Sequence, residues 1–273
     1  MEHYMTDERI ADYLKALENE ERAAATIEKY RRVLMSFAAF LCGTAVTQEM
    51  IRLWKDDLRE KNYAPSTINT YLAALNGFFR FNGWLDCRAR FLKIQRRLFR
   101  DSKQELTRVE YERLVAAAEA AGDRRLALLM ETICSTGIRV SEVQYITVEA
   151  AKNGKTEIAL KGKIRTILLP AKLCRKLLKF AARQKTASGA IFRAKSGKAM
   201  SRYQIWSKMK KLCVRAGVDA GKVFPHNLRH LFATAFYRAY KDIVKLADVL
   251  GHSSIETTRI YLVTSAAEHR RQL

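Results

Sequence analysis

The residues best suited to chemistry lie close together near the end of the chain. Residues 225–230 read Pro-His-Asn-Leu-Arg-His, residues 250–252 read Leu-Gly-His, and a tyrosine follows at position 261. On a helix His226 and Arg229 would project from one face, because they are three residues apart. The window therefore collects imidazoles and a guanidinium, which carry protons and bind phosphate, with a phenol that could serve as a nucleophile.

Short helices and turns must bring these groups together. Pro225 suits the first turn of a helix, where its missing N–H costs nothing. Gly251 is expected to end the next helix, since glycine tolerates the left-handed conformation there. Ser253 with Glu256 predicts a capping box for a third helix, which carries Tyr261.

The order of these groups resembles the C-terminal signature of the tyrosine recombinases, the phage integrase family. His-x-x-Arg at 226–229, Leu-Gly-His at 250–252 and a tyrosine nine residues after that histidine follow the family pattern. Upstream, residues 135–143 match its first arginine motif around Arg139, and Lys-Gly-Lys-Ile-Arg at 161–165 matches its hairpin lysine. The resemblance spans nearly the whole chain, and the ordered set of motifs is far more specific than any one of them.

The resemblance implies that Tyr261 attacks a DNA phosphodiester and forms a 3′-phosphotyrosyl intermediate. Two arginines that stay charged, Arg139 and Arg229, would bind the non-bridging oxygens. His226 would accept the proton of the phenol, and His252 would add a hydrogen bond to the phosphate. Because arginine and lysine supply the positive charge, no metal and no cofactor are expected.

Two lysines compete for the remaining proton transfer. Lys161 is the predicted proton donor to the departing 5′ oxygen, with Lys163 as the alternate, because this hairpin is shorter than the usual family pattern. Glu142 either forms a purely structural salt bridge with Arg139 or orients the arginines from behind the phosphate contacts.

A zinc site and other nucleophiles are weaker interpretations of the same window. His226 and His230 are four residues apart, a spacing that zinc ligands also use. The metalloprotease pattern has Glu directly after the first histidine, however, and this chain has Asn227 there, so we expect no metal. Tyr237 and Tyr240 are possible nucleophiles, but an aromatic residue on a helix is more often part of a core.

The charge of the chain is strongly positive and unevenly distributed. Its 273 residues carry a formal net charge of +22. Residues 1–87 hold 11 Lys/Arg against 13 Asp/Glu, a net of −2, whereas residues 88–273 hold 39 against 15, a net of +24. This asymmetry indicates a polyanionic partner that is bound mainly by the second part of the chain. The resemblance implies double-stranded DNA, with a core site of inverted repeats, bound by a homo-tetramer.

Nothing in the sequence indicates a secreted or membrane protein. The five cysteines form no Cys-x-x-Cys pair, so they are interpreted as reduced thiols. The N-terminus is charged and lacks the apolar region of a signal peptide, and no apolar run approaches ~18 residues. We therefore expect a cytoplasmic protein without a membrane partner.

The spacing of apolar residues predicts a mainly α protein. Residues 1–87 are predicted to form four short helices, an all-α bundle that resembles the SAM-like core-site-binding domain of the family. Residues 88–104 are interpreted as a basic linker, with six Lys/Arg and no acid in 88–100; the alternative is a solvated face. Residues 105–273 predict a mostly α catalytic domain with a small antiparallel sheet at 153–170.

Basic and polar side chains in three places are the candidate DNA contacts. The lysines at the tip of the predicted hairpin could enter a DNA groove, although lysines also protect edge strands against aggregation. The linker would follow the phosphate backbone, and the N-terminal helices would grip one side of the DNA. The candidates are Lys163, Arg165, Arg96, Arg97, Lys61 and Thr67.

The sequence therefore predicts a site-specific DNA recombinase, or integrase, that cleaves and rejoins DNA without metal or ATP. With no further domain ahead of residue 7, the chain resembles the two-domain Xer-like or small mobile-element members of the family. A type IB topoisomerase would share the chemistry, but the N-terminal bundle and the tail after Tyr261 argue against it. A DNA-binding accessory protein that never cleaves fits the full set of catalytic residue types less well.

Overall fold

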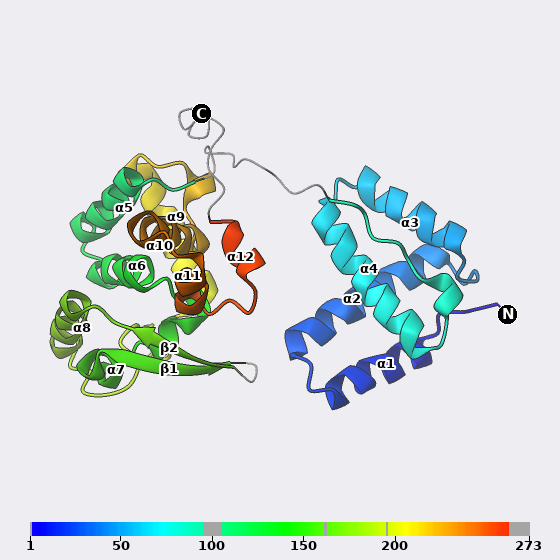
Figure 1. Cartoon of the computed structure of the whole chain (residues 1–273), viewed down its shortest axis with the longest axis horizontal. Coiled ribbons are helices and arrows are strands. Elements are labelled where there is room, and N and C mark those ends of the chain that lie inside the picture. The colour runs from blue at the N-terminus through cyan, green and yellow to red at the C-terminus, as the bar shows by residue number, and fades with distance from the viewer. Residues whose placement is uncertain (1, 95–104, 161–162, 195, 262–273) are drawn as a thin grey trace. The chain divides into compact units, whose positions relative to one another are not determined.

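A computed structural model of the chain describes residues 2–94, 105–160, 163–194 and 196–261. Contacts divide the chain into two compact units, residues 1–96 and 97–273. Figure 1 shows helices throughout both units and a hairpin of two strands in the second. The predicted fold class, mainly α with a small antiparallel sheet, is confirmed.

Helix caps set where the helices of the first unit begin. The Thr6 and Thr47 side chains accept hydrogen bonds from backbone N–H groups in the first turns of α1 and α3, groups that a helix otherwise leaves unsatisfied. Pro65 stands at the start of α4, where no N–H is needed. The elements are α1 (Asp7–Asn19), α2 (Ala24–Leu41), α3 (Gln48–Glu60), α4 (Pro65–Phe81) and the 3₁₀ helix η1 (Leu85–Cys87).

The helices of the first unit pack around a core rich in aromatic rings. Phe37, Trp54, Phe78 and Phe79 are each at most 1% exposed. The Phe37 ring centroid lies 4.8 Å from that of Trp54 and 6.4 Å from that of Phe79. Such rings remove large apolar areas from water, so these aromatic residues form the core of the first unit.

An extended segment after η1 lies along α4. Asn76 holds the backbone of Ala89 with two hydrogen bonds of 2.8 and 3.0 Å, and Asn69 holds the backbone of Leu92 with two of 2.7 and 2.9 Å. Each carboxamide donates and accepts at once, as the backbone of a neighbouring strand would. Residues 88–94, which the sequence analysis assigned to the linker, therefore pack as part of the first unit.

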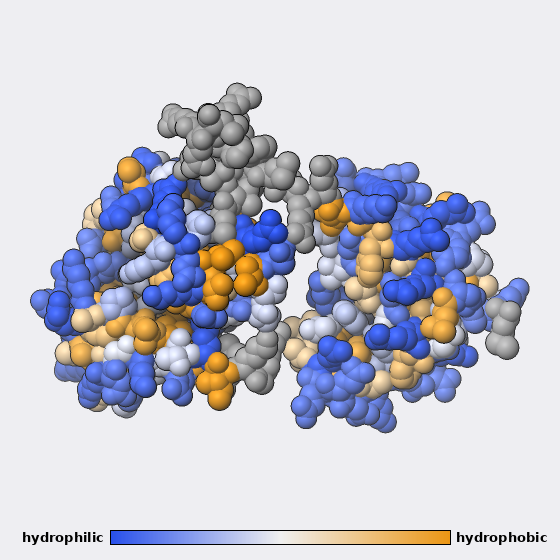
Figure 2. Space-filling view, in the orientation of Figure 1, coloured by the Kyte–Doolittle hydropathy of each residue, from blue (hydrophilic) through white to orange (hydrophobic). Residues whose placement is uncertain are grey.

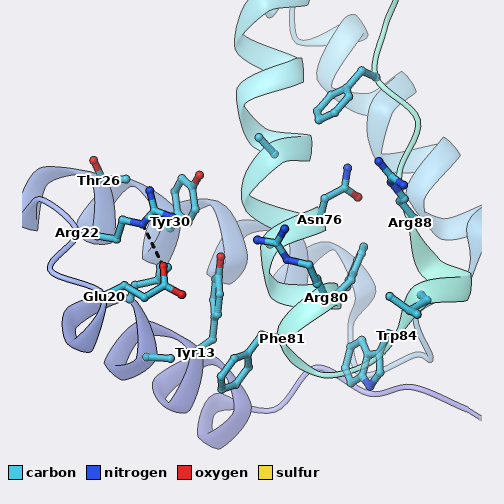
Figure 3. Close-up of a pocket in the computed structure, with 17 residues that line it drawn as sticks. Tyr13, Glu20, Arg22, Thr26, Tyr30, Asn76, Arg80, Phe81, Trp84 and Arg88 are labelled. Carbon is cyan, nitrogen blue, oxygen red and sulfur yellow. Dashed lines mark hydrogen bonds and ion pairs between the residues drawn. The ribbon is translucent and has the colours of Figure 1, made fainter.

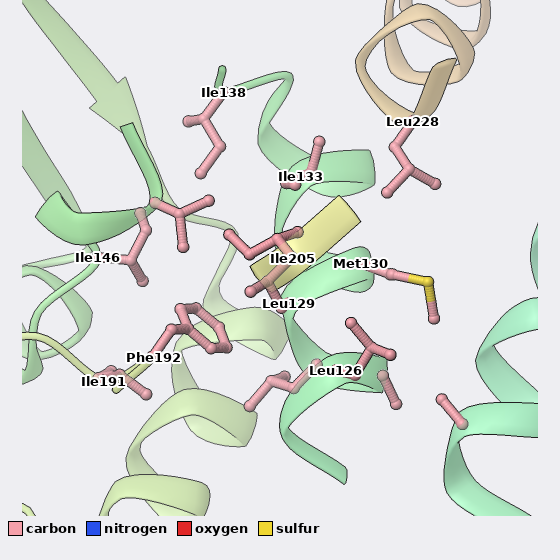
Figure 4. Packing of buried hydrophobic residues seen from close by; sticks show 14 of the residues in the cluster. Leu126, Leu129, Met130, Ile133, Ile138, Ile146, Ile191, Phe192, Ile205 and Leu228 are labelled. Carbon is pink, nitrogen blue, oxygen red and sulfur yellow. The ribbon is translucent and has the colours of Figure 1, made fainter. Parts of the chain in front are cut away.

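The second unit is built around α6 (Arg124–Thr136). Leu129 and Ile133 of this helix are fully buried. Figure 4 shows them near side chains from distant parts of the chain, among them Phe192 and Ile205. The other elements are α5 (Arg108–Ala120), η3 (Val140–Tyr145), α7 (Val148–Asn153), α8 (Ala171–Arg183), α9 (Arg202–Ala216), η4 (Ala220–Lys222), α10 (Pro225–Tyr240), α11 (Ile243–Leu250) and α12 (Ile255–Arg259).

The hairpin of the second unit joins β1 (Lys155–Leu160) to β2 (Lys163–Leu168) in antiparallel register, within the predicted sheet region. Ile167 of β2 is 2% exposed, whereas Ile164 is 77% exposed. Side chains alternate along a strand, so Arg165 lies on the same face as Ile167. The guanidinium of Arg165 therefore begins on the face that meets the protein interior.

Hydrophilic residues cover most of the visible surface of each unit (Figure 2). Across the described ranges, no helix combines the length and apolarity that crossing a bilayer requires. The five cysteines are free thiols, and Cys87 is one of the buried ones. Burial raises the pKa of the Cys87 thiol to about 11, so this thiol is protonated and unreactive at neutral pH.

Candidate active site

A tight turn places Arg139 in the site. Gly137 ends α6 with a φ of 64°, which glycine adopts without steric cost. An added Cβ would lie 2.4 Å from Cδ1 of Phe232, so no other residue fits. The 3₁₀ helix η3 follows, and the backbone N–H of Arg139 donates to Oε2 of Glu142 over 2.7 Å. The turn thereby sets Arg139 beside Glu142.

One buried carboxylate accepts hydrogen bonds from two arginines. Glu142 is 1% exposed, and its carboxylate accepts from Arg139 over 2.9 Å and from Arg165 over 2.9 Å. Arg229 is 2% exposed. Burial lowers its pKa, and the positive charges of Arg139 and Arg165 lie close enough to lower it further. These four residues, the arginine cluster, carry three positive charges against one negative charge. The excess of two suits an anion such as a phosphate.

The carboxyl end of α11 orients all three guanidinium groups. The last carbonyls of a helix have no partner inside the helix and carry partial negative charge. Here the carbonyls of three consecutive residues, 249–251, each accept a hydrogen bond from a different arginine. The pairs are Arg165 with Val249 (2.7 Å), Arg229 with Leu250 (2.7 Å) and Arg139 with Gly251 (3.1 Å).

Glycine is required where α11 ends. Gly251 has a φ of 63°, which confirms the expectation that it ends the helix in the left-handed conformation. An added Cβ would lie 2.3 Å from Cδ of Arg165, far inside van der Waals contact. The small size of Gly251 therefore lets the Arg165 side chain pass to Glu142.

Burial and like charge act together on the guanidinium groups. Desolvation, followed by the Arg139 charge, lowers the pKa of Arg229 to about 10, while a hydrogen bond with Tyr261 opposes this change. Burial also lowers the pKa of Arg165, and the Glu142 charge opposes it. Arginine remains charged at neutral pH even so. The positive excess is therefore permanent under physiological conditions.

His252 accepts a hydrogen bond from an arginine in this arrangement. Its Nε2 lies 2.9 Å from a terminal nitrogen of Arg229, and its Nδ1 lies 2.9 Å from Oγ1 of Thr258. A guanidinium has donors only, so Nε2 must accept and the ring must be neutral. Burial, with the Arg229 and Arg139 charges next in importance, lowers the pKa of His252 to about 4. The imidazole thus supports Arg229, and the hydrogen bond to phosphate expected of it stays a prediction.

Tyr261 is surrounded by three imidazoles. It is 4% exposed, and its ring centroid lies 5.0 Å from that of His230, 5.9 Å from that of His252 and 6.4 Å from that of His226. The His252 ring is stacked on it at 10°, whereas the His230 ring is nearly perpendicular at 81°. The phenol ring is therefore packed among imidazoles.

The helix that leads to Tyr261 begins one residue later than predicted. The N-cap of α12 is Ser254, whose hydroxyl accepts from the N–H of Glu256 over 3.2 Å. The predicted capping box between Ser253 and Glu256 is wrong. Two adjacent serines have the same capping preference, so the turn after Gly251 decides which one caps the helix.

A pocket of about 530 Å³ opens beside the arginine cluster. Arg139, His226 and Arg229 line it, together with Tyr203 and Trp206 of α9. His226 is exposed, so its imidazole can exchange protons with solvent. The pocket gives an anion from solution a route to Arg139 and Arg229.

Some predicted residues lie outside the described part of the chain. Lys161 is one, and the predicted DNA contacts Arg96 and Arg97 are others. For Lys163 the structure describes the backbone, which begins β2. The roles of both lysines therefore stay predictions. The other predicted catalytic residues lie together in the second unit: Arg139, His226, Arg229, His252 and Tyr261.

Arg165 has a larger part in the site than the sequence analysis gave it. It was predicted as a DNA contact, but its side chain is 10% exposed and bonds to Glu142 and to the carbonyl of Val249. Alternation along β2 puts Arg165 on the same face as Ile167, but residue types do not show that this face is the buried one.

Neither Thr258 nor His230 was predicted to belong to the recombinase site, and His230 was considered only as a zinc ligand. Thr258 is fully buried, and His230 has the shortest ring-to-ring distance to Tyr261 of the three histidines. Helical spacing is the only signal for them. His230 comes four residues after His226, and Thr258 comes three before Tyr261.

The first unit has a basic pocket of its own, about 510 Å³ in volume. Arg22, Arg80 and Arg88 line it, and Figure 3 shows Arg80 on α4 and Arg22 paired with Glu20 over 3.1 Å. Of the three, only Arg88 belonged to a prediction, as the first residue of the basic linker. The near-neutral net charge of this part of the chain therefore conceals a local gathering of positive charge.

The predicted DNA contacts of the first unit lie away from that pocket. Lys61 is bonded to Asp57 over 2.8 Å, with its side chain 61% exposed, and a pair so exposed is held weakly. Thr67 is half-buried in the first turn of α4. Both roles stay predictions.

Among the described residues, one group has the arrangement of metal ligands: His3, Asp86 and Cys87 in the first unit. The His3 ring bonds to Asp86 over 3.0 Å and stacks on Trp84 with centroids 4.9 Å apart. These contacts account for the position of His3 on the bundle.

The sequence of the chain matches two family descriptions. The "Phage integrase family" covers residues 104–268, and the "Phage integrase, N-terminal SAM-like domain" covers residues 10–84. The chain is 30% identical over 276 residues to tyrosine recombinase XerA of Pyrococcus furiosus, covering 97% of this chain and 92% of that protein. It is also 30% identical over 284 residues to tyrosine recombinase XerD of Brucella suis, covering 92% and 91%.

The fold is also similar to solved structures. One is a lambda integrase tetramer bound to a Holliday junction, with a TM-score of 0.76 and 17% sequence identity. The match covers 93% of this chain and 76% of that chain.

Proposed function

The chain belongs to the phage integrase family and is a tyrosine-type site-specific recombinase, and we propose that it cleaves and rejoins DNA with Tyr261 as its nucleophile. The observation that carries this proposal is the excess of two positive charges in the arginine cluster, which bonds to Tyr261 through Arg229. A phosphodiester carries about one negative charge, and its pentavalent transition state carries more. The cluster therefore favours the transition state over the ground state.

The proposed cleavage step is a transesterification. The phosphate enters the pocket beside the cluster, and Arg139 and Arg229 donate to its non-bridging oxygens. The hydroxyl oxygen of Tyr261 attacks phosphorus, and the bond between phosphorus and the 5′ oxygen breaks as the new one forms. The products are a 3′-phosphotyrosyl ester and a free 5′ hydroxyl.

Two proton transfers accompany this step. His226 takes the proton of the phenol, a role supported by its exposure and its place in the pocket wall. The departing 5′ oxygen takes a proton from Lys161, or from Lys163. Because the phosphotyrosyl ester conserves the bond energy, a second DNA hydroxyl reverses the step without ATP.

Glu142 and His252 act through the arginines. Glu142 accepts from Arg139 and Arg165, and His252 accepts from Arg229. Neither needs to touch the phosphate to affect the rate, because each fixes the direction of a guanidinium that does.

We propose double-stranded DNA with a core site of inverted repeats as the partner, bound by a homo-tetramer in the cytoplasm. The net charge of +22 supports a nucleic acid, and the likeness to a tetramer on a Holliday junction supports the assembly. We also propose residues 1–87 as the core-site DNA-binding domain, 88–104 as the basic linker, of which residues 88–94 pack on the first unit, and 105–273 as the catalytic domain. The two family matches, at 10–84 and 104–268, support this division.

Recombination on a supercoiled plasmid tests the function. Two copies of an inverted-repeat site, taken from DNA that flanks the gene, are placed on one plasmid and incubated with the protein. Exchange of the flanking segments, seen as new restriction fragments, is the expected result. Relaxed plasmid without exchange would indicate a type IB topoisomerase, and binding without strand cleavage would indicate an accessory protein. Either of these outcomes would overturn the proposal.

A further inference from the structure

A hydrogen-bonded chain connects the helix of the nucleophile to an arginine of the cluster. Thr258 lies on α12 three residues before Tyr261, and its carbonyl accepts from the N–H of Tyr261 over 3.0 Å. Its hydroxyl lies 2.9 Å from Nδ1 of His252. The opposite nitrogen of that ring, Nε2, lies 2.9 Å from Arg229. Thr258 itself is fully buried.

The direction of each bond follows from the chemistry of the groups. The guanidinium of Arg229 can only donate, so Nε2 of His252 accepts. A neutral imidazole carries one N–H, which must then be on Nδ1. The Thr258 hydroxyl oxygen therefore accepts that N–H and anchors the ring. The other tautomer would turn an N–H of His252 toward an N–H of Arg229.

We propose that Thr258 is a positioning residue, which anchors the His252 ring by accepting its Nδ1–H and so keeps Nε2 directed at Arg229. Because Thr258 and Tyr261 are on one short helix, docking of that helix delivers the nucleophile and completes the phosphate-binding group in one event. When the helix is not docked, His252 lacks this partner, and its Nε2 is no longer held in place as one of the acceptors of Arg229. The catalytic consequence rests on the proposed function, but the tautomer itself does not.

The tautomer can be observed directly on the full chain without DNA. Long-range proton–nitrogen NMR spectra of protein labelled with ¹⁵N-histidine distinguish a protonated Nδ1 from a protonated Nε2, and His252→Gln identifies the signals of His252. The wild-type ring is expected to carry its proton on Nδ1. Thr258→Ser, which keeps the hydroxyl, should preserve this state. Thr258→Val, which keeps the shape alone, should leave the proton on Nδ1, because Arg229 still donates to Nε2, but it should shift the Nδ1 and N–H signals, which lose their hydrogen bond.

Two results would overturn the hydrogen bond assigned between Thr258 and His252. One is a wild-type ring with its proton on Nε2, and the other is a Thr258→Val protein whose His252 spectrum is unchanged. Both apply whether or not the protein recombines DNA. Failure of the proposed function is therefore distinguishable from failure of this inference.

A matched pair of substitutions separates positioning from folding. Thr257 and Thr258 are adjacent on α12, but Thr257 is exposed, so Thr257→Val imposes the same loss of helix propensity without touching His252. With a nicked inverted-repeat DNA in single turnover, Thr258→Val should slow cleavage by about ten- to a hundredfold, because it leaves a buried donor unsatisfied. The Kd for DNA should stay within about twofold, since the phosphate contacts to the backbone remain.

Rescue decides between a structural and a positioning role. Thr258→Ser should restore cleavage to within about threefold of wild type, because the hydroxyl acceptor is retained. The positioning role is refuted if Thr257→Val slows cleavage as much as Thr258→Val does. It is also refuted if Thr258→Val cleaves at the wild-type rate, or if the serine variant is as slow as the valine variant.

Discussion

At the scale of residues, the site depends on a single buried carboxylate. Glu142 offsets the repulsion among three guanidinium groups, so Glu142→Gln should destabilise the second unit although the shape of the side chain is kept. We expect a loss of about 3 kcal/mol in the free energy of opening, the low end for a broken buried pair, because the Arg139 side chain is 42% exposed. Native-state hydrogen exchange of the α6 amide groups measures this loss for the second unit alone.

Glu157→Gln is the matched control for that experiment. Glu157 lies on β1 and is exposed, so its substitution should change the same free energy by less than about 0.5 kcal/mol. If the α6 amide groups are equally protected from hydrogen exchange in Glu142→Gln and in Glu157→Gln, the charge of Glu142 does not hold the cluster together.

The pKa of His252 gives a prediction for the pH dependence of the fold. Burial and the arginine charges lower it to about 4, from about 6.5 in an unfolded chain. The unfolded state therefore binds more protons between these values. The contribution that the neutral ring makes to the stability of the fold is fully present above about pH 6.5 and is lost as the pH falls toward 4. An NMR titration of the His252 ring signals should have its midpoint near pH 4; a midpoint near 6.5 would show that the ring is not held by the arginines.

At the scale of elements, the carboxyl end of α11 is the common support of the three arginines. Gly251→Ala places a Cβ 2.3 Å from Cδ of Arg165 and also strains a backbone with positive φ. We expect the free energy of unfolding to fall by about 2–3 kcal/mol, of which the left-handed backbone accounts for about 1–2 kcal/mol. Cleavage of DNA should fall at least about tenfold, since a shift of Arg165 disturbs Glu142 and Arg139.

Gly154→Ala is the control for this variant. Gly154 also has a positive φ, 69°, but no atom lies within 4 Å of an added Cβ. This substitution should show the backbone strain alone, about 1–2 kcal/mol by urea denaturation, with cleavage unchanged. Equal losses of stability and activity in the two alanine variants would contradict the role assigned to the contact with Arg165.

The elements could be predicted from the sequence where their signals are local. Thr107 and Glu110 predict a capping box for α5, and the structure confirms it with both bonds present. The inward face of β2 is harder to predict, because Ile164 and Ile167 lie on opposite faces and both are apolar. Nothing in that pattern says that Arg165 points inward. Which face is buried is decided by tertiary packing, not by propensity.

The backbone support of the arginines could not be predicted from residue types. Besides Glu142, which the sequence indicates, they have backbone acceptors, namely the carbonyls of residues 249–251 and the carbonyl of Gly137, which accepts from Arg229 over 2.6 Å, and every residue carries a carbonyl. The sequence therefore indicates Arg139, Arg229 and Glu142 through their motifs, but it does not indicate these carbonyls. The same limit applies to Thr258, whose importance depends on the ring that it faces.

At the scale of the whole molecule, the packing of residues 88–94 on the first unit changes how the charge is divided. Residues 1–94 hold 14 Lys/Arg and 13 Asp/Glu, a net of +1, and residues 95–273 hold 36 and 15, a net of +21. Counterion release should give a slope of about −0.9 per neutralised phosphate in a log–log plot of affinity against salt. A fragment beginning at residue 95 should keep most of the slope of the full chain, measured by fluorescence anisotropy.

The complementary fragment tests the same division of charge. Residues 1–94 should bind DNA weakly and with a shallow slope, because their net charge is near zero. A steep slope from this fragment alone would mean that Arg22, Arg80 and Arg88, which line its pocket, supply most of the phosphate contacts. The division of DNA binding between the two units would then be the reverse of our account.

The measurement that tests the account most directly is covalent capture of DNA by Tyr261. A nicked suicide substrate releases the short fragment that carries the new 5′ hydroxyl and so traps the protein on the 3′ phosphate, and a denaturing gel resolves the adduct. The account predicts an adduct for the wild type and for Tyr237→Phe, with mass spectrometry placing the nucleotide on Tyr261, and none for Tyr261→Phe. An adduct that persists in Tyr261→Phe, or that maps to Tyr237 or Tyr240, would contradict it.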